Sequence, residues 1–543
     1  MSDQRSKVVI LGLDGATFRL LDPLMDAGAM PALKRLCERG TKTILRSTVP
    51  TYTPPAWVSM ATGVNPGKHG IYGFLATTPQ EETKIAHSGY ISSPPMWSYL
   101  NKMGLKAGAL NIPMYYPPTP VDGFMIGGGL AAGWTELSQP NFASEPELND
   151  FVNGLAGGSY PLDTVVSYEN DWRSDEVIDR ITRVQKLRHN VLNALLEKRD
   201  VDAVFAVFEG PDRLQHLHYQ YLVEFSDWYD APEAARARDK ATEFFSEADA
   251  AIQSMVDWAG SDGHVLVVSD HGFGPWQKTL NMNLLLEQWG FLKLPQMSKV
   301  TQSRVIAGAG QRLARKILPR RWLHAMKARV GRNIDWEQTK AFASHVAEQG
   351  IHVNVRGEMP EGHIDPEDAS SVIDELVERL TDLRDPDDGE PVVDEIVRRE
   401  DVIHGPHATR APHLFPFCRD QYYELSDTVA ASSPFTDHRD RPWGYHHKDG
   451  VLVAAGPGVA QGEFAEGLDI VDIVPLAFHL AGLPVPEGLD GRVRPGMLAG
   501  DAATREVATA GMKVEHETSE ENPYSAEEEA AIEESLRGLG YVE

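Results

Sequence analysis

Hydrophobic and polar positions alternate along the chain in a way that predicts an α/β protein. Short, nearly continuous apolar runs are typical of strands buried on both faces of a sheet. The expected strands are Lys7–Leu13, Lys106–Asn111, Asp202–Phe208, His264–Ser269 and Gly450–Ala455. The expected helices, from apolar residues at helical spacing, are Met30–Arg39, Ser174–Arg199, Ala234–Ala259, Pro366–Asp382 and Ile470–Ala481. Strands that alternate with helices favour a largely parallel central sheet.

Two stretches interrupt this alternation. Residues 134–172 are polar and irregular, with weak periodicity. Residues 276–335 are expected to form a helical insertion, and within it the segment 299–332 holds ten Lys or Arg residues and no Asp or Glu. A solvated basic face explains this charge most simply. The functional alternatives are a lid that supplies positive charge to a phosphate-bearing substrate, and a surface for a membrane or an acidic partner.

The end of the chain is rich in Glu. From Val514 to Glu543 there are ten Glu residues and one Arg. The pattern predicts a short amphipathic helix with Ile532, Leu536 and Leu539 on one face, docked or frayed as terminal helices commonly are. We therefore expect three parts. One discontinuous core domain spans 1–275 and 336–500, a basic helical insertion or cap spans 276–335, and an acidic tail spans 501–543.

Composition narrows the classes of protein that remain. The 543 residues are 42% hydrophobic and 24% charged, so a sizeable core can form. Two cysteines, Cys37 and Cys418, exclude a disulfide framework and a cysteine-based metal site. A net charge of −28 argues against bulk nucleic-acid binding. No apolar run reaches the ~18 residues that span a bilayer, and no export signal is visible, so a cytoplasmic location is expected.

Asp and His residues follow several of the expected strands. They are Asp14 after the first strand, Asp212 with His216, the pair Asp270–His271, and His446–His447 before the last strand. Because ligands bind beyond the carboxyl ends of strands in open α/β sheets, these residues are candidates for one site. Asp carboxylates with neutral imidazoles suit zinc, manganese or iron better than calcium. Each residue alone is more often a turn, a cap or a surface pair, and it is their joint position that favours a metal site.

Thr53 is the candidate nucleophile. It stands in a Thr-Pro-Pro sequence before an apolar helical segment, which resembles a nucleophile at the N-terminus of a helix. There the backbone N–H groups and the helix dipole favour an anion such as phosphate. The simpler alternative is that Thr53 only caps the helix.

Together these motifs resemble a known family. Asp14, Thr53, the run Thr62-Gly63-x-x-Pro66-x-x-His69-Gly70, Asp212-x-x-x-His216, Asp270-His271-Gly272 and His446 occur in the order found in the alkaline phosphatase superfamily. Over roughly residues 7–490 the chain is similar to its type I phosphodiesterase/nucleotide pyrophosphatase branch, and within it to prokaryotic proteins described as predicted phosphohydrolases or phosphomutases. The resemblance implies an alkaline-phosphatase-like three-layer sandwich with a largely parallel central sheet and helical insertions.

The resemblance also implies a ligand set for two divalent metal ions, usually zinc, although manganese and iron accept the same ligands. Asp14, Thr53, Asp270 and His271 would hold one ion, and Asp212, His216 and His446 the other. His446 is preferred over His447 because it stands four residues before Gly450. His69 belongs to a recurring structural turn of the family and is not expected to be a ligand.

The implied activity is that of a metal-dependent phosphohydrolase. It would cleave a small phosphodiester or nucleotide-like substrate through a phosphothreonine at Thr53. A phosphomutase or phosphotransferase, in which an alcohol replaces water, would use the same site, and a non-catalytic binding protein that kept the fold is the third alternative. The Cys-x-Pro-x-Arg segment of sulfatases does not occur, which argues against sulfatase activity. The substrate, the metal and the oligomeric state stay open.

Overall fold

The computed structural model describes residues 6–76, 84–129, 141–164, 166, 171–295, 334–344, 349–429, 431–514 and 516–538. The chain forms two compact units. The first unit comprises Met1–Phe74, Ile85–Pro275 and Pro442–Leu539, and the second comprises Leu75–Lys84, Trp276–Arg441 and Gly540–Glu543. The basic segment 299–332 lies outside the described residues. Among the described residues, no helix is long and apolar enough to cross a membrane.

The first unit is built on a mostly parallel sheet that has nine strands within the described residues. The strand order is β17-β2-β16-β6-β1-β5-β3-β4, and β18 also pairs with β2. These strands are β1 (Val8–Leu13), β2 (Thr41–Arg46), β3 (Ala107–Ile112), β4 (Gly123–Gly127), β5 (Ala203–Phe208), β6 (His264–Val268), β16 (Asp449–Ala455), β17 (Gly462–Glu463) and β18 (Leu468–Asp469). Strand β1 pairs in parallel with β5 and β6, whereas β16 is antiparallel to β2 and β6. All five expected strands are confirmed in this sheet.

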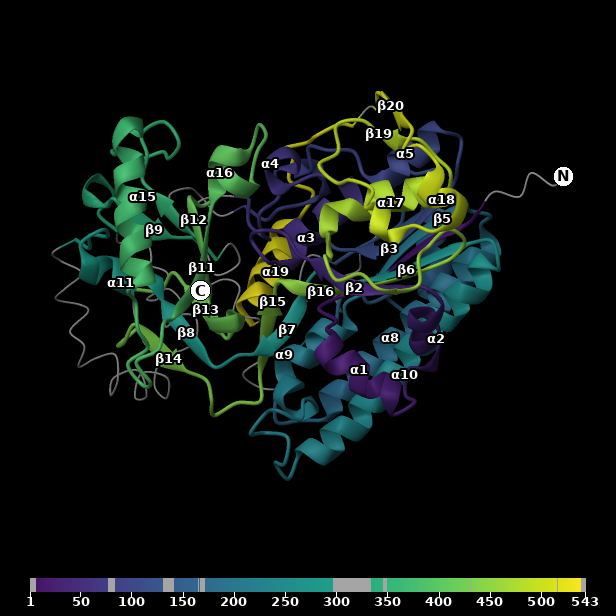
Figure 1. Cartoon of the computed structure of the whole chain (residues 1–543), viewed down its shortest axis with the longest axis horizontal. Coiled ribbons are helices and arrows are strands. Elements are labelled where there is room, and N and C mark those ends of the chain that lie inside the picture. The colour runs from purple at the N-terminus through teal and green to yellow at the C-terminus, as the bar shows by residue number, and fades with distance from the viewer. Residues whose placement is uncertain are drawn as a thin grey trace. The chain divides into compact units, whose positions relative to one another are not determined.

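Helices cover both faces of the sheet (Figure 1). Helices α1, α2, α8, α9 and α10 lie below the sheet in that view, and α3, α5 and α17 lie above it. The helices of this unit are α1 (Phe18–Asp26), α2 (Pro31–Arg39), α3 (Thr53–Thr62), α4 (Pro66–His69), α5 (Met96–Lys102), α6 (Pro146–Ala156), α8 (Glu176–Lys198), α9 (Gly210–Leu222), α10 (Ala234–Ala259), α17 (Ile473–Leu480), α18 (Gly500–Thr504) and α19 (Ala526–Gly538). Two short strand pairs accompany them: β7 (Gly272–Pro275) with β15 (Gly444–His447), and β19 (Val485–Pro486) with β20 (Thr509–Ala510). The expected three-layer α/β architecture is confirmed.

Helix α10 shows how the sequence specifies one of these layers. Its buried residues Phe244, Ala248, Ile252 and Met255 recur every three or four positions, so they form one apolar face. The helix ends at Gly260, whose φ of +73° is a conformation that glycine adopts at little cost. The same logic places the expected helices at α2, α8, α15 (Pro366–Thr381) and α17, with shifts of a few residues at their ends.

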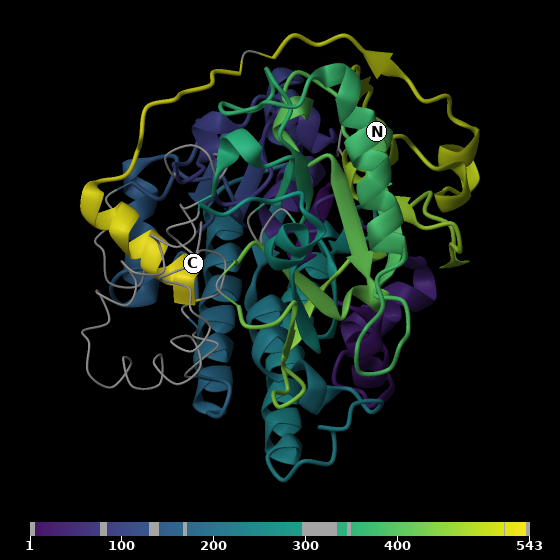
Figure 2. The ribbon, with the colours of Figure 1, turned by 90° about the vertical axis from the view of Figure 1, so that its left-hand side faces the viewer.

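The structure adds a helix that the sequence pattern did not indicate. Helix α6 lies within the stretch expected to be irregular, and the residues it buries include Leu148 and Val152. The terminal helix, in contrast, is confirmed as α19, with Ile532 and Leu536 fully buried, whereas Leu539 lies outside the described residues. Figure 2 shows the extended segment that leads to it from β20. In that segment the Ser519 N–H donates to the Gly89 carbonyl at 2.9 Å, so the acidic tail is docked.

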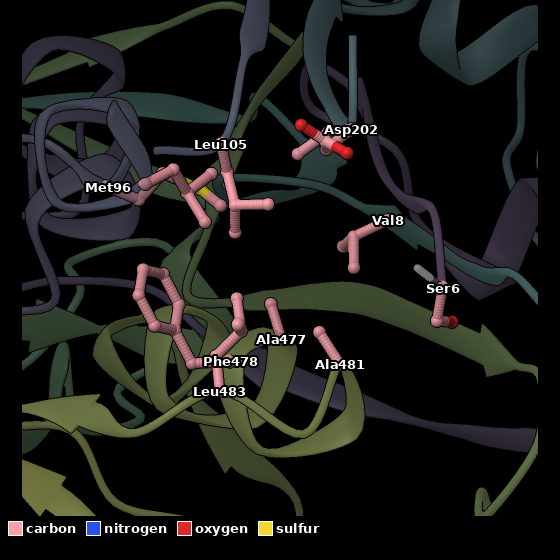
Figure 3. Close-up of a pocket in the computed structure, with 11 residues that line it drawn as sticks. Ser6, Val8, Met96, Leu105, Asp202, Ala477, Phe478, Ala481 and Leu483 are labelled. Carbon is pink, nitrogen blue, oxygen red and sulfur yellow. The ribbon is translucent and has the colours of Figure 1, made fainter. Parts of the chain in front are cut away.

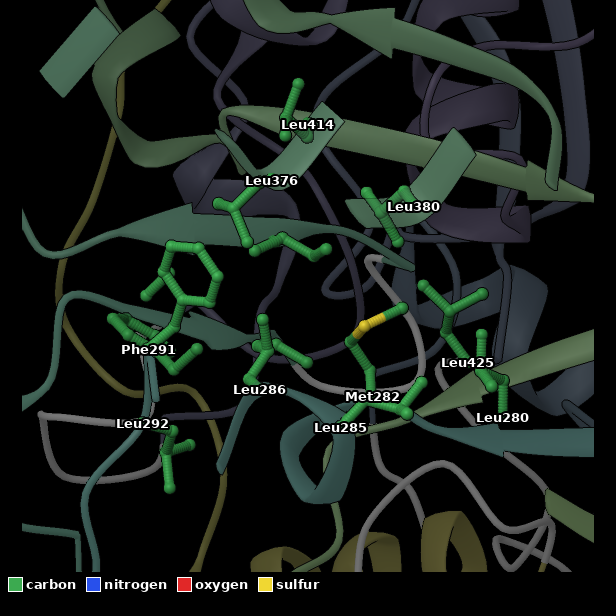
Figure 4. Packing of buried hydrophobic residues seen from close by; sticks show 14 of the residues in the cluster. Leu280, Met282, Leu285, Leu286, Phe291, Leu292, Leu376, Leu380, Leu414 and Leu425 are labelled. Carbon is green, nitrogen blue, oxygen red and sulfur yellow. The ribbon is translucent and has the colours of Figure 1, made fainter. Parts of the chain in front are cut away.

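The second unit has its own sheets and core. Its strands are β8 (Lys278–Asn281), β9 (Ala341–Ala343), β10 (Ile351–Val353), β11 (Val393–Arg398), β12 (Leu414–Cys418), β13 (Tyr423–Ser426) and β14 (Phe435–Asp437), and its helices are α11 (Met282–Trp289), α15 (Pro366–Thr381) and α16 (Arg399–Val402). Figure 4 shows residues of its core, among them Leu286 from α11, Leu376 from α15 and Leu414 from β12. Because of this shared core, residues 336–441 pack with the residues that follow Trp276. The boundaries expected from the sequence instead put residues 336–441 in the larger core domain.

Candidate metal centre

The expected site residues lie at one edge of the central sheet. Asp14 directly follows β1, and Asp270 and His271 follow β6. Asp212 lies in the first turn of α9, just beyond β5. Because β5, β1 and β6 are neighbouring parallel strands, their carboxyl ends bring these residues together, as expected for an open α/β sheet.

Local geometry aims the remaining ligand-type residues at the same place. His216 lies four residues after Asp212 on α9, so both side chains share one face of the helix. His446 lies in β15, where successive side chains point to opposite sides, and this separates it from His447. Gly15 lets the backbone after β1 pass close to the ring of Phe273. A Cβ at this position would lie 2.6 Å from Phe273 Cε2, and the φ of +68° favours glycine.

The ligand-type side chains form one compact, buried cluster. Asp212 Oδ1 lies 3.3 Å from His216 Nε2, 3.4 Å from His446 Nε2 and 4.0 Å from His271 Nε2. Two groups of three have ligand atoms close enough to share an ion. One is Asp212, His216 and His446, and the other is Asp14, Asp212 and His271.

Asp270 joins the second group through His271. Its Oδ2 atom lies 3.3 Å from His271 Nε2, which is also 3.7 Å from Asp14 Oδ1. Asp14, Asp270 and His271 are all fully or almost fully buried. The structure therefore brings together all six of the expected Asp and His residues.

Each of the three carboxylates has one oxygen held by the protein. Trp57 Nε1 donates to Asp14 Oδ2 at 3.0 Å, and the Gly15 N–H donates to Asp270 Oδ1 at 3.1 Å. Arg213 Nη1 donates to Asp212 Oδ2 at 2.8 Å. The other oxygens, Asp14 Oδ1, Asp270 Oδ2 and Asp212 Oδ1, are buried without a hydrogen-bond partner in the described part of the chain.

Two of the histidines are oriented in the same manner. His216 Nδ1 lies 3.2 Å from the Gly444 carbonyl, and His271 Nδ1 lies 3.1 Å from the Gly272 carbonyl. Only a protonated Nδ1 can donate to a carbonyl, so in the neutral form of each ring the lone pair is on Nε2, the nitrogen that faces the cluster. Metal-ligating histidines are held by this kind of outer hydrogen bond.

The electrostatics of the cluster favour the binding of positive charge. Burial, Asp270 and Asp212 raise the pKa of Asp14 well above its usual range, and burial raises the pKa of Asp270 to about 8. For the histidines burial has the opposite effect, because it lowers the pKa of His271 well below its usual range and that of His446 to about 4. Asp212 behaves differently: burial raises its pKa, but His216, His446 and Arg213 outweigh burial and hold that pKa well below its usual range. Asp14 and Asp270 therefore ionise readily in this buried space only when further positive charge joins them.

Thr53 lies beside this cluster at the start of α3. Its Oγ1 is 3.3 Å from His271 Nε2, and unlike the ligand-type residues it is partly exposed. Tyr52, not Thr53, occupies the N-cap position. Pro54 and Pro55 have no N–H to donate, so among the first three residues of this helix only Thr53 can offer a backbone N–H to an anion.

Two other histidines that the sequence singled out lie outside the cluster. His69 Nδ1 accepts from the Ile71 N–H at 3.2 Å, so its Nε2 carries the proton and donates to Ser59 Oγ at 2.8 Å. This pairing suits the structural turn expected for His69. His447 Nδ1 accepts from the Asp449 N–H at 3.1 Å.

The sequence did not reveal the residues that hold the ligands in place. Trp57 and Arg213 each donate to a cluster carboxylate, and Gly15 does so through its backbone. Trp57 lies 43 positions from Asp14, so no local pattern links them. Arg213 adjoins Asp212 in sequence, and this adjacency was the one available signal.

A separate cavity of about 160 Å³ lies at the opposite edge of the sheet. Figure 3 shows its lining, which includes Val8 from the beginning of β1 and Phe478 from α17. The lining is mostly apolar, and none of the seven expected site residues contributes to it. The chemistry-bearing residues are at the other ends of the strands, so this cavity is not the candidate site.

Comparison with known proteins places this arrangement in a family. A model of the family described as type I phosphodiesterase / nucleotide pyrophosphatase matches residues 8–430. Structures of phosphonoacetate hydrolase from Sinorhizobium meliloti 1021, with phosphonoformate or phosphonoacetate, align with a TM-score of 0.53 at 17% and 16% identity, over 88% of this chain and 95% of theirs. They show the shared fold. Human ectonucleotide pyrophosphatase/phosphodiesterase 5 aligns with a TM-score of 0.45 at 15% identity, over 89% of this chain and 97% of that one. The chain belongs to the type I phosphodiesterase/nucleotide pyrophosphatase family of the alkaline phosphatase superfamily, and it is a hydrolase that acts on phosphoric ester bonds.

Proposed function

We propose that this protein hydrolyses a small phosphate ester, of the phosphodiester or nucleotide-like class, through a phosphothreonine at Thr53. One observation carries the proposal. Asp14, Asp212 and Asp270 each keep one buried oxygen unpaired among the described residues, and these oxygens converge with three histidines beside the Thr53 hydroxyl. Such a donor set suits divalent cations of the zinc, manganese or iron type.

The donor set divides between two ions. Asp212, His216 and His446 would hold one, and Asp14, Asp270, His271 and Thr53 would hold the other. Two bound cations supply Lewis acidity toward the phosphate oxygens and lower the pKa of a coordinated hydroxyl or water. Zinc is the expected metal, and manganese and iron are compatible with the same side chains.

The covalent steps belong to Thr53. Its Oγ1 attacks phosphorus, the bond from phosphorus to the leaving alkoxide breaks, and the Thr53 proton passes to solvent. Water then attacks the phosphothreonine, the Oγ1–phosphorus bond breaks, and phosphate or a phosphomonoester leaves. The cluster carboxylates and imidazoles orient the reacting groups, and their burial keeps bulk water from all but the exposed side of Thr53.

A substrate panel with a matched pair of variants tests the proposal. Purified protein loaded with zinc or manganese would be assayed with bis-(p-nitrophenyl) phosphate, p-nitrophenyl phosphate, a nucleotide and a sulfate ester. Thr53→Ala should abolish turnover and keep most of the metal. Thr62→Ala, at the other end of α3, removes a hydroxyl that donates to the Val58 carbonyl among the described residues, and it should keep turnover. Full activity of Thr53→Ala would refute the covalent mechanism, and a wild-type protein that no divalent metal binds or activates would refute the metal-dependent function.

A further inference from the structure

Asp212 differs from the other two carboxylates in how it is held. Arg213 Nη1 donates to Asp212 Oδ2, and Arg213 Nη2 reaches both oxygens of Asp163 at 3.1 and 3.3 Å. Arg213 and Asp163 are both buried. One guanidinium therefore joins a carboxylate of the metal centre to a second carboxylate that lies outside it.

A second buried ion pair supports the first. The Thr164 N–H donates to Asp163 Oδ1 at 2.6 Å, and Thr164 Oγ1 donates to Glu209 Oε1 at 3.0 Å. The other oxygen of Glu209 pairs with Arg188, and Arg188 Nη2 donates to the Leu162 carbonyl at 2.8 Å. Contacts with Arg213 and Arg188 thus hold the segment around Asp163 in place, although its sequence pattern did not indicate a helix or strand.

Four buried charges are an expensive way to obtain stability alone. Removing an ion from water costs several kcal/mol, and well-packed apolar residues often stabilise a fold as well as a buried ion pair does. The network of Arg188, Glu209, Asp163 and Arg213 reaches the metal centre through the hydrogen bond from Arg213 to Asp212 Oδ2. Through this hydrogen bond the network orients that carboxylate.

We propose that Arg213 and Asp163 are a positioning pair for Asp212, a role that rests on the metal-dependent function proposed above. Arg213 occupies Oδ2, so Asp212 offers a cation only Oδ1, the atom that faces the histidines. Asp163 fixes the plane of the guanidinium and offsets its charge, so Asp212 keeps its attraction for a cation. Neither residue needs to contact substrate, since both act through Asp212.

Cobalt(II) is a suitable probe because its d–d absorption reports ligand geometry. The full-length chain would be stripped of metal, reloaded with cobalt, and titrated against a chelator. Arg213→Met should lower cobalt affinity about 10- to 100-fold, the usual effect of losing an outer partner of a ligand, and change the d–d bands. Arg213→Lys, which can still donate one hydrogen bond to Asp212, should recover part of the affinity.

A double-mutant cycle tests whether Asp163 acts through Arg213. Asp163→Asn alone should weaken cobalt binding less than Arg213→Met does. Added to Arg213→Met, it should have no further effect, because its route to Asp212 is already lost. Lys278→Met is the matched control, since it breaks a buried pair with Asp385 in the second unit. It should lower the melting temperature and leave cobalt affinity and spectrum unchanged.

The outcomes separate the two proposals. Wild-type affinity and spectrum in Arg213→Met would overturn the positioning role and leave the proposed function standing. Equal effects of Asp163→Asn in both backgrounds would overturn the link between the two residues. If Arg213→Met does not fold, Arg213→Lys and Asp163→Asn carry the test with the same readouts. If wild-type protein binds neither cobalt, zinc nor manganese, the proposed function fails and the positioning role fails with it.

Discussion

His216 Nε2 and His446 Nε2 lie 2.9 Å apart in the buried cluster, although 230 positions separate them in the chain. His216 Nδ1 lies 3.2 Å from the Gly444 carbonyl, so in the neutral ring the proton is on Nδ1 and Nε2 presents its lone pair to the other ring. Burial lowers the pKa of His446 to about 4, which keeps that ring neutral at neutral pH. Neutral imidazoles are ligands that zinc accepts.

His446 should therefore be essential for metal binding, and His447 should not. His446→Ala removes a ring whose Nε2 lies 3.4 Å from Asp212 Oδ1, so we expect it to lose one equivalent of metal and lower turnover more than the ~10–100-fold typical of an outer partner. His447→Ala is the matched control, because its ring accepts from the Asp449 N–H outside the cluster. Metal analysis and turnover of the two variants provide the measurement. Equal metal loss in both would show that β15 as a whole, and not His446, supports the site.

Trp57 should support metal binding through its indole N–H, which donates to Asp14. Trp57→Phe keeps an aromatic ring in the core but removes the donor to Asp14 Oδ2, so we expect zinc affinity to fall about 10- to 100-fold. Trp97→Phe is the control, since Trp97 is equally buried and its Nε1 has no hydrogen-bond partner in the described part of the chain. Chelator competition on both variants measures the difference. The prediction fails if the two lose affinity equally.

The sequence indicated the sheet and the site for the same physical reason. Strands such as Val8–Leu13 and Ala203–Phe208 are covered on both faces, so they appear as continuous apolar runs, and the polar residue after each run marks the carboxyl edge. Once three parallel strands adjoin, Asp14, Asp212 and Asp270 must be near one another. Their positions after buried strands, together with the family resemblance, were therefore enough to predict that they lie close together.

What the sequence did not reveal depends on contacts between distant segments. Helix α6 shows a weak pattern, because Leu148 and Val152 supply most of its apolar face. The bond from Trp57 to Asp14 and the chain from Asp163 to Asp212 cross between elements, and no periodicity encodes them. Residues 336–441 were expected in the core domain, since nothing in their composition shows that they complete the second unit's core.

Gly15 should resist substitution for two reasons that can be separated. A side chain at its φ of +68° costs about 1–2 kcal/mol, and a Cβ there would also meet Phe273 at 2.6 Å. Gly15→Ala should therefore destabilise the protein by about 1–3 kcal/mol more than strain alone, and lower activity by shifting Asp14 and Asp270. Gly28→Ala is the control, with a φ of +80° and no atom within 4 Å of the added Cβ. Similar unfolding free energies for both variants, with unchanged activity, would contradict the prediction.

Metal removal should make stability depend on pH in a defined direction. The pKa of Asp270 rises from 3.8 to about 8 in the folded, metal-free protein, so the folded state binds a proton that the unfolded state releases. That contribution to stability is complete below about pH 4 and is lost as pH rises through 8. The pKa of His446 falls to about 4, so its contribution is lost only as pH falls below about 6.5.

Between pH 6.5 and 8.5 the carboxylates therefore determine the trend of the cluster. The melting temperature of metal-free protein should decrease across this window, and zinc should remove most of the decrease because it replaces the proton. Asp270→Asn cannot ionise and, without metal, should show a flatter profile than the wild type. Thermal melts of the three samples in buffers of matched ionic strength make the comparison. A metal-free wild type that gains stability toward pH 8.5 would show that these carboxylates are not the groups that the cation neutralises.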